Sequence, residues 1–390
     1  GMKPNLGKIN YYLKNSLMLV TKLSPTIGYY NAAKIAQHAF EQNMTLKESA
    51  MDLQLLSEEE FDIAQKNIFI FTPERFLSFM DSHQHLHFNF AFIDDHFNYH
   101  TQQDDLAHLS QKTLKHQGTY IMPLLHYFAN ANLASLDSGE DYVYFNTPFA
   151  FISYPFSWNL WLVLGAGILF IFFVFIGIGK RTLSIPEIGR GFIPLFGSLL
   201  ISGAVAFLGW KTLKVFYPQY QDILHGFTYN GHSYIAFFTF VTLAICFAFY
   251  QKFYFENKSM NYAVAPIFLW ILINIGLAIY LPGAGFFIIP VFCSILMLAY
   301  FVITQKTNWL LNLILAIPAF IILVPFIVMF PIGLGLKMLA GSAVLAALVF
   351  ALLLPVFGYY PKKGNWAMAM LLIAAGFFIK AHLGAPYEQG

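Results

Sequence analysis

WNLWLVLGAGILFIFFVFIGI, residues 158–178, decides the fold, because 21 consecutive residues contain no charged side chain. At 1.5 Å per residue, a helix of this length is about 30 Å long, which matches the hydrocarbon core of a bilayer. Further apolar runs of similar length follow it, so the sequence predicts about eight membrane spans. The seven later runs centre on residues 192–210, 233–250, 262–280, 284–304, 309–330, 338–359 and 365–383.

Acidic residues divide the chain into two parts. Of the 20 Asp and Glu residues, 16 precede Trp158, and only Glu187, Asp222 and Glu256 lie between Trp158 and Leu383. The fold class predicted is therefore mainly α, with a multi-pass helical bundle behind a water-soluble part. The lipid bilayer is the expected partner. A net charge of +2 gives no reason to expect a nucleic acid.

Basic residues in the loops predict the orientation of the bundle. Loops one, three, five and seven carry eight Lys and Arg residues, whereas loops two, four and six carry three. The positive-inside rule then puts the odd loops in the cytoplasm and both termini on the non-cytoplasmic side. No export signal is expected in this sequence, since the apolar run at 16–23 is short and has no cleavage site.

The first 64 residues predict a small helical subdomain. Residues 29–43 carry apolar side chains at the i, i+3, i+4 spacing of an amphipathic helix. Thr45 with Glu48, and Ser57 with Glu60, have the spacing of capping boxes that begin two further short helices. The pattern alone indicates a packing module without chemistry of its own.

Five short motifs give this subdomain a resemblance to the C-terminal subdomain of class II fumarases. They are NSLMLVT at 15–21, IGY at 27–29, AAKIA at 32–36, TLKE at 45–48 and LSEEEFD at 56–62. The family's catalytic serine lies in a loop of the type G-S-S-x-M-P-x-K-x-N on an earlier domain. Nothing in this chain matches that loop, so the resemblance implies a fumarase-like piece that does not hydrate fumarate alone.

Residues 65–87 form a junction between the two parts of the chain. Residues 68–71 are a candidate strand, and His83, His85 and His87 would share one face of a strand. Three histidines on one face can hold a metal ion. A polar face or an unfolded junction explains the same pattern, and both alternatives stay open.

Residues 88–130 predict a strand, a histidine loop and a helix, which together are a partial α/β unit. FNFAFI at 88–93 has the pattern of a buried strand, and 110–130 has helical periodicity. NFAFIDD at 89–95, YHTQQD at 99–104 and TLKHQG at 113–118 resemble the C-terminal end of membrane-bound zinc aminopeptidases of metallopeptidase family 28. This resemblance extends over about residues 88–383.

The peptidase resemblance implies zinc as cofactor and His100 as its last protein ligand. Asp104 would then orient that imidazole, or it would simply cap the helix that follows. A two-zinc site also needs an H-x-D pair, bridging carboxylates and a carboxylate base, and no H-x-D occurs in this chain. Glu58-Glu59 imitates the family's Glu-Glu pair but belongs to the second capping box. The expected site is incomplete, and no peptidase activity is expected.

The bundle itself has few polar side chains that a transport pathway would use. Its span centres hold no Asp, Glu or Arg, and Asn274 and Asn312 are the main polar candidates. An anchoring bundle and a transporter both remain possible interpretations. Pro266, Pro290, Pro318, Pro325 and Pro355 predict kinks or breaks in the helices.

These observations predict five segments. They are a fumarase-like subdomain at 1–64, a junction at 65–87, a peptidase-like fragment at 88–157, a transmembrane bundle at 158–383 and a tail at 384–390. The leading interpretation is a membrane protein related to zinc aminopeptidases with an incomplete site. The alternatives are a fumarase-related fragment tethered to the membrane, and a transporter.

Overall fold

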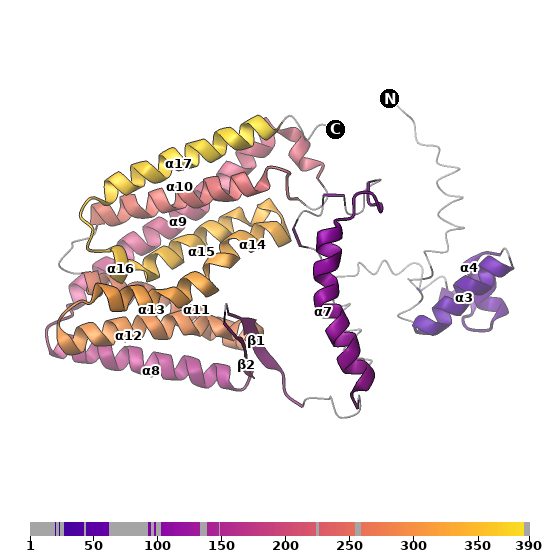
Figure 1. Ribbon diagram of the computed structural model, residues 1–390, viewed down its shortest axis with the longest axis horizontal. Helices are drawn as coiled ribbons and strands as arrows, with labels where there is room; N and C mark the ends of the chain where they lie inside the picture. The colour runs from indigo at the N-terminus through magenta and orange to yellow at the C-terminus, as the bar shows by residue number, and fades with distance from the viewer. Residues whose placement is uncertain are drawn as a thin grey trace. The chain divides into compact units, whose positions relative to one another are not determined.

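The chain is described by a computed structural model (Figure 1), and it divides into two compact units, residues 1–91 and residues 92–390. The structure describes residues 20, 23, 27–42, 44–61, 93–94, 97–98, 103–132, 139–147, 149–223, 226–253 and 259–385. The candidate strand at 68–71, nearly all of the strand at 88–93 and the histidines at 83, 85 and 87 lie outside these residues. The predicted domain boundaries therefore stay predictions.

The first unit contains two described α-helices, α3 (Tyr29–Glu41) and α4 (Leu46–Asp52). Gly28 precedes α3 with φ +79°, a conformation that glycine adopts at little cost. Because the apolar residues of both helices recur at helical spacing, they gather on one side and form a core. The buried members of this core are Leu23, Ala32, Ile35, Ala39, Leu46, Ala50, Leu56 and Phe61.

The second unit begins with one exposed helix and one hairpin. Helix α7 (Gln111–Asn130) confirms the helix predicted at 110–130, and Ser110 caps it by accepting a hydrogen bond from the Thr113 amide. Strands β1 (Tyr142–Asn146) and β2 (Phe151–Pro155) pair antiparallel from Tyr142↔Pro155 to Asn146↔Phe151. This hairpin was not predicted, although its aromatic and β-branched residues favour strands.

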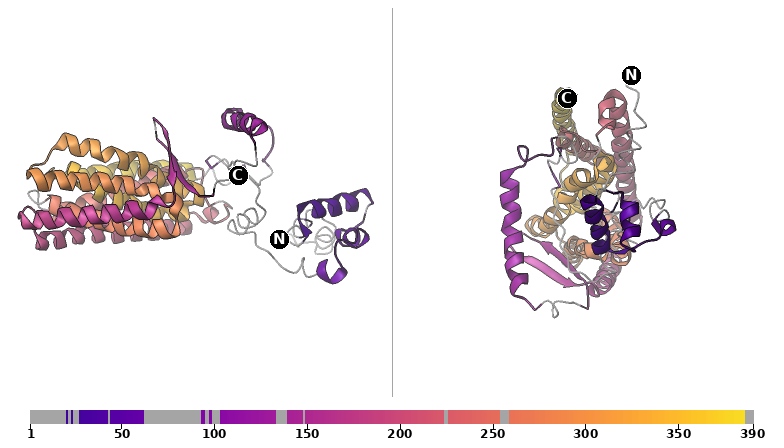
Figure 2. Two further views of the ribbon diagram at one scale, coloured as in Figure 1. Left: turned by 90° about the horizontal axis from the view of Figure 1, so that it is seen from below. Right: turned by 90° about the vertical axis from the view of Figure 1, so that its right-hand side faces the viewer.

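The rest of the second unit is a bundle of long apolar helices with roughly parallel axes (Figures 1 and 2). Among the described residues, seven helical segments are long and apolar enough to cross a membrane. They match seven of the predicted spans. In order they are α8 (Trp158–Gly179), α9 (Ile185–Phe216), α10 (Gly231–Phe253), α11 (Ser259–Tyr280), η5 (Pro282–Phe287) with α12 (Ile288–Thr304), α13 (Trp309–Ile322) with α14 (Val324–Leu334), and α17 (Lys363–Gly384).

The eighth predicted span, 338–359, needs a correction. Its residues form η6 (Leu336–Met338), α15 (Leu339–Leu352) and the single turn α16 (Leu354–Phe357) in place of one long helix. The apolar helix from Leu336 to Leu352 is shorter than the other seven. Pro355 has no amide hydrogen to continue the ladder, which explains the break after Leu352.

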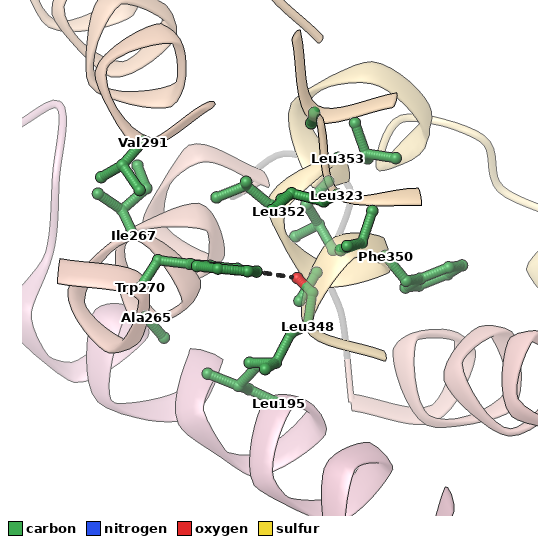
Figure 3. Close-up of a cluster of buried hydrophobic side chains, with 14 of the residues drawn as sticks. Leu195, Ala265, Ile267, Trp270, Val291, Leu323, Leu348, Phe350, Leu352 and Leu353 are labelled. Carbon is green, nitrogen blue, oxygen red and sulfur yellow. Dashed lines mark hydrogen bonds between the residues drawn. The ribbon is translucent and has the colours of Figure 1, made fainter. Parts of the chain in front are cut away.

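The core of the bundle is centred on α15, in which eleven of the fourteen residues are buried. Its neighbours include α9, α10, α11 and α14. Figure 3 shows Leu348, Phe350, Leu352 and Leu353 from this region beside Trp270 and Ile267 of α11 and Leu195 of α9. A short helix fits here because apolar neighbours surround it.

Candidate functional site

The candidate functional residues fall into three groups, which belong to the first unit, to the loop before α7 and to one end of the bundle.

In the first unit, α3 and α4 are joined by specific polar contacts as well as by their apolar core. The Ser49 hydroxyl is fully buried and donates to the Ile35 carbonyl oxygen at 2.8 Å. On the surface, His38 Nε2 lies 2.7 Å from Asp52 Oδ2. Sequence analysis missed Ser49, whose only signal was its position among apolar residues on the inner face of α4.

Both predicted capping boxes form. The Glu48 amide donates to the Thr45 hydroxyl at 3.2 Å, and the Thr45 amide donates back to the Glu48 carboxylate at 2.8 Å. Ser57 and Glu60 repeat this exchange. Backbone and side-chain donors of Thr45 hold the pKa of Glu48 below its usual value, and those of Ser57 do the same for Glu60.

The Glu58-Glu59 pair lies between Ser57 and Glu60, inside the second capping box. Glu58 makes an ion pair with Lys47 at 2.8 Å, with 71% of the Glu58 side chain exposed. Such a contact joins two neighbouring helix starts on the surface, and it contributes little to stability.

The loop before α7 holds the residues that the peptidase resemblance singled out. His100 lies outside the described residues, so its assignment as a zinc ligand stays a prediction. Asp105 forms a local turn: its carboxylate accepts from the His108 amide at 3.0 Å and lies 2.7 Å from the His108 ring nitrogen Nδ1. These bonds lower the pKa of Asp105. Within the described part of the chain, no group of three His, Cys, Asp or Glu residues could hold a metal ion.

One end of the bundle carries a hydrogen-bonded network that sequence analysis did not predict. Asn230 Nδ2 donates to the Tyr220 hydroxyl at 2.9 Å and to the Ala381 carbonyl at 2.8 Å, and the Thr228 hydroxyl donates to Asn230 Oδ1 at 2.7 Å. The Tyr220 and Tyr234 hydroxyls lie 3.1 Å apart. This network ties the segment before α10 to the end of α17, which is a structural role.

The two asparagines considered for a transport pathway bond to backbone groups. Asn274 Nδ2 donates to the Trp270 carbonyl at 2.9 Å, one turn back in α11. Asn312 Nδ2 donates to the Pro355 carbonyl, also at 2.9 Å, next to the break after α15. Both side chains are buried. Asn312 therefore donates a hydrogen bond to a backbone carbonyl at a break in the helix, where the helix itself supplies no donor.

Comparison with known proteins finds relatives for part of the first unit. A family model for the fumarase C C-terminus matches residues 19–66. The chain is 60% identical over 62 residues to a class II fumarate hydratase of Helicobacter pylori, and this match covers 16% of the chain and 13% of that enzyme. It is 56% identical over 62 residues to the Bacillus subtilis enzyme, with coverage of 16% and 13%.

A third relative gives the same picture. The Rickettsia prowazekii class II fumarate hydratase is 51% identical over 78 residues, which is 20% of this chain and 16% of that enzyme. The chain thus spans less than a fifth of the length of these relatives. No solved structure matches the chain. The fumarase resemblance is confirmed for residues 19–66, whereas no finding supports the resemblance of residues 88–383 to zinc aminopeptidases.

Proposed function

We propose that this chain is an integral membrane protein that holds a fumarase-related subdomain at a bilayer and docks it onto class II fumarase subunits. The observation that carries the proposal is the 60% identity over 62 residues, joined in one chain to seven apolar helices. A subdomain with its own buried core and two complete capping boxes keeps the shape that a partner of the same family would recognise.

Catalysis by this chain alone is not part of the proposal. The loop that carries the family's catalytic serine has no counterpart in the sequence. The segment shared with the fumarate hydratases is 13% to 16% of their length. The function proposed is therefore attachment of a lyase-family module to the membrane, and hydration of fumarate would belong to the partner.

The exposed face of α3 offers a docking surface in the first unit. Tyr30 is 83% exposed and Phe40 is 75% exposed, and large exposed aromatic side chains are typical anchors of protein interfaces. Charge on an anchor of this kind disrupts binding, whereas charge on a polar neighbour is tolerated. Phe40→Glu and the matched surface variant Gln37→Glu therefore make a test pair.

The experiment is co-purification from detergent of the tagged full-length chain with intact class II fumarase from Bacillus subtilis. The proposal predicts retention of fumarase by the native chain and by Gln37→Glu, and a loss of at least about tenfold for Phe40→Glu, which corresponds to the cost of removing one interface anchor. Hydrogen exchange of residues 27–61 checks that both variants keep the subdomain folded. Equal failure of all three chains to retain fumarase would refute docking.

A second candidate function keeps the leading interpretation of the sequence, a relative of membrane-bound zinc aminopeptidases with an incomplete site. The observation that favours it is local: α7 follows the histidine loop and the hairpin leads into α8. His100 would be the zinc ligand and the cofactor would be zinc. Zinc in the purified chain that is lost in His100→Ala would support this candidate, whereas a stoichiometry near two zinc ions per chain would contradict the expected incompleteness of the site.

Orientation separates the two candidates. The loop charges predict both termini on the non-cytoplasmic side, which suits a peptidase fragment facing a lumen or the outside. Docking onto fumarase instead requires the first unit on the side of the membrane where the enzyme is. Protease protection of an N-terminal tag in sealed cells or vesicles decides the question, since each candidate predicts the opposite result.

A further inference from the structure

Helix α7 has two chemically different faces, and Leu114, Ile121 and Leu125 of the apolar face are exposed. Its apolar side chains recur at i, i+7, i+11 and i+14 from Leu114, through Ile121 and Leu125 to Phe128. No residue of this 20-residue helix is buried, and Leu114 and Leu125 are 52% and 61% exposed. An apolar stripe of this length in water is costly, so a partner of matching chemistry is expected.

The opposite face of α7 is basic. Lys112, Lys115, His116 and His126 lie on it, and the helix contains no Asp or Glu. An amphipathic helix with lysines on the polar face and leucine and phenylalanine on the other is the pattern that lies in a membrane interface. The charges suit anionic headgroups.

The chain before α7 is attached to the segment that leads into α10. Asp94 Oδ1 lies 3.1 Å from His232 Nε2. The Phe97 ring lies 4.2 Å from Tyr229 and 6.2 Å from Phe227, measured between ring centroids. Thirteen residues separate Phe97 from the first residue of α7.

The chain after α7 is attached to the turn between α11 and α12. Phe145 of β1 lies 5.0 Å from Phe286 of η5, measured between ring centroids. The Ser157 amide donates to the Glu140 carboxylate at 3.3 Å, which closes the base of the hairpin beside the start of α8. Eleven residues separate Asn130 from Tyr142.

Both attachment points lie at the same end of the bundle. Successive long helices alternate in direction, so the start of α8, the end of α9, the start of α10 and the turn before α12 share one end. Hydrogen bonds between these segments agree with this grouping. The Leu336 amide donates to the Gly226 carbonyl at 2.8 Å, and Asn159 Nδ2 donates to the Pro282 carbonyl at 2.8 Å. The Asn230 contact with Ala381 adds the end of α17.

Aromatic side chains mark this end as the level of the headgroups. Trp158 and Trp161 at the start of α8 are 55% and 73% exposed, and Tyr229 and Tyr280 are 58% and 81% exposed. Trp and Tyr gather where a spanning helix leaves the hydrocarbon. A helix tethered on both sides to this level can reach the interface plane without leaving the bundle.

We propose that α7 is an interfacial helix that docks on the surface of the bilayer, with Leu114, Ile121, Leu125 and Phe128 in the acyl boundary and Lys112 and Lys115 against anionic headgroups. The inference rests on membrane insertion of the bundle, which is part of the proposed function. It does not depend on fumarase docking. Its ligand is a lipid surface, and the apolar stripe together with the acid-free face selects it.

Depth measurements on the full-length chain in nanodiscs containing phosphatidylserine test the proposal. Cys246 and Cys293 are replaced by Ala, and a spin label is placed in turn at Leu125→Cys, Lys115→Cys and Phe172→Cys. Collisions with oxygen report hydrocarbon, and collisions with a water-soluble nickel chelate report solvent. The expected result is oxygen access at 125 and nickel access at 115.

The label at 172 tests insertion of the bundle separately from α7, because Phe172 lies on α8 and is 54% exposed. Nickel access at 172 would overturn insertion of the bundle itself. Oxygen access at 172 with nickel access at 125 would overturn the interfacial helix alone. Shielding of 125 from both reagents would show that protein, such as a second copy of this chain, covers the apolar face.

Charge provides an independent test. Hydrogen exchange of residues 111–130 should slow when phosphatidylserine replaces phosphatidylcholine in the nanodisc, by about fivefold for each lysine that contacts the surface. Lys112→Gln/Lys115→Gln should abolish the difference between the two lipids, whereas Lys34→Gln in the first unit should keep it. The same exchange in both lipids for the native chain would overturn the role of the lysines.

Discussion

The indole nitrogen of Trp270 on α11 donates to the carbonyl oxygen of Leu348 on α15 across 3.3 Å in the centre of the bundle (Figure 3). Both residues belong to the main buried core, and Trp270 is 1% exposed. A buried indole needs a partner for its single donor. This bond therefore fixes the axial position of α15 along α11, which apolar contacts alone would not specify.

Trp270→Phe is predicted to destabilise the bundle by about 1 kcal/mol through the lost hydrogen bond, with a further packing cost for the smaller ring. Thermal unfolding of the detergent-solubilised chain measures the effect. Trp309→Phe is the control, since Trp309 is 61% exposed and should leave the midpoint nearly unchanged. Equal unfolding midpoints for the two variants would show that the Trp270 hydrogen bond does not contribute to the stability of the bundle.

Gly285 in η5 is predicted to reject any side chain as long as Asn159 is present. A Cβ at this position would overlap the buried Asn159 side chain, which also donates to the Pro282 carbonyl. Gly285→Ala should therefore lower the unfolding midpoint in the native background. In the Asn159→Ala background the same change should cost less, because the obstructing group has gone.

A double-mutant cycle of thermal midpoints measures this coupling. Gly283→Ala in the same turn is the matched control, because an added Cβ there has open space around it apart from a distant ring atom of Phe156. Additive effects of Gly285→Ala and Asn159→Ala would contradict the proposed overlap.

Thr45→Ala is predicted to weaken the first unit by removing one half of a capping box. The Glu48 amide and carboxylate would both lose their Thr45 hydroxyl partner. Protection factors of α4 amides should fall about fivefold, as expected for loss of a good N-cap. Thr45→Ser keeps the hydroxyl and should restore most of the protection; failure of Ser to do so would argue against the cap as the cause.

Stability of the first unit is predicted to fall at acidic pH. The pKa values of Glu48 and Glu60 are lowered from their ordinary values in the folded chain, first by backbone donors of Thr45 and Ser57. Groups with lowered pKa values stabilise the fold above their unfolded pKa, and that contribution disappears as the pH falls through the folded pKa. Amide protection of residues 45–61 should therefore decline as the pH drops from 5 towards 3.

The matched chain for the pH test is Glu48→Gln/Glu60→Gln. It keeps side chains that can accept the capping bonds but removes the two titrating groups. The amide protection of this variant should be lower than that of the native chain at neutral pH, and it should change less on acidification. The same pH dependence in both chains would assign the effect to other carboxylates.

The parts of the structure that sequence analysis predicted are those that depend on neighbouring residues. Thr45 with Glu48 and Ser57 with Glu60 form their boxes because the partners are three residues apart. The span at 158–178 becomes α8 because length and polarity alone decide it. Helix α7 likewise follows from its periodicity.

The parts that sequence analysis missed depend on distant residues. The break after Leu352 in the span predicted at 338–359 could be expected from Pro355, but the hydrogen bond that Asn312 of α13 donates to the carbonyl of that proline could not. The β1–β2 hairpin lies beside η5, more than a hundred residues later in the chain. The role of Asn230 could not be predicted from the sequence, because its hydrogen-bond partner at Ala381 is 151 residues away.

Asn230→Leu is predicted to release the end of α17 from the bundle. The native side chain joins Thr228, Tyr220 and the Ala381 carbonyl through three hydrogen bonds, and a leucine of similar volume can make none of them. Each lost bond to a partly buried partner costs about 1 kcal/mol. Hydrogen exchange of residues 374–385 should therefore accelerate by at least about tenfold, while exchange in α11 stays unchanged.

Asn308→Leu is the matched control, because that side chain caps α13 at the other end of the bundle. Unchanged exchange at 374–385 in Asn230→Leu would mean that apolar contacts of α10 with α17, such as Phe237 with Phe378, hold the helix without the network.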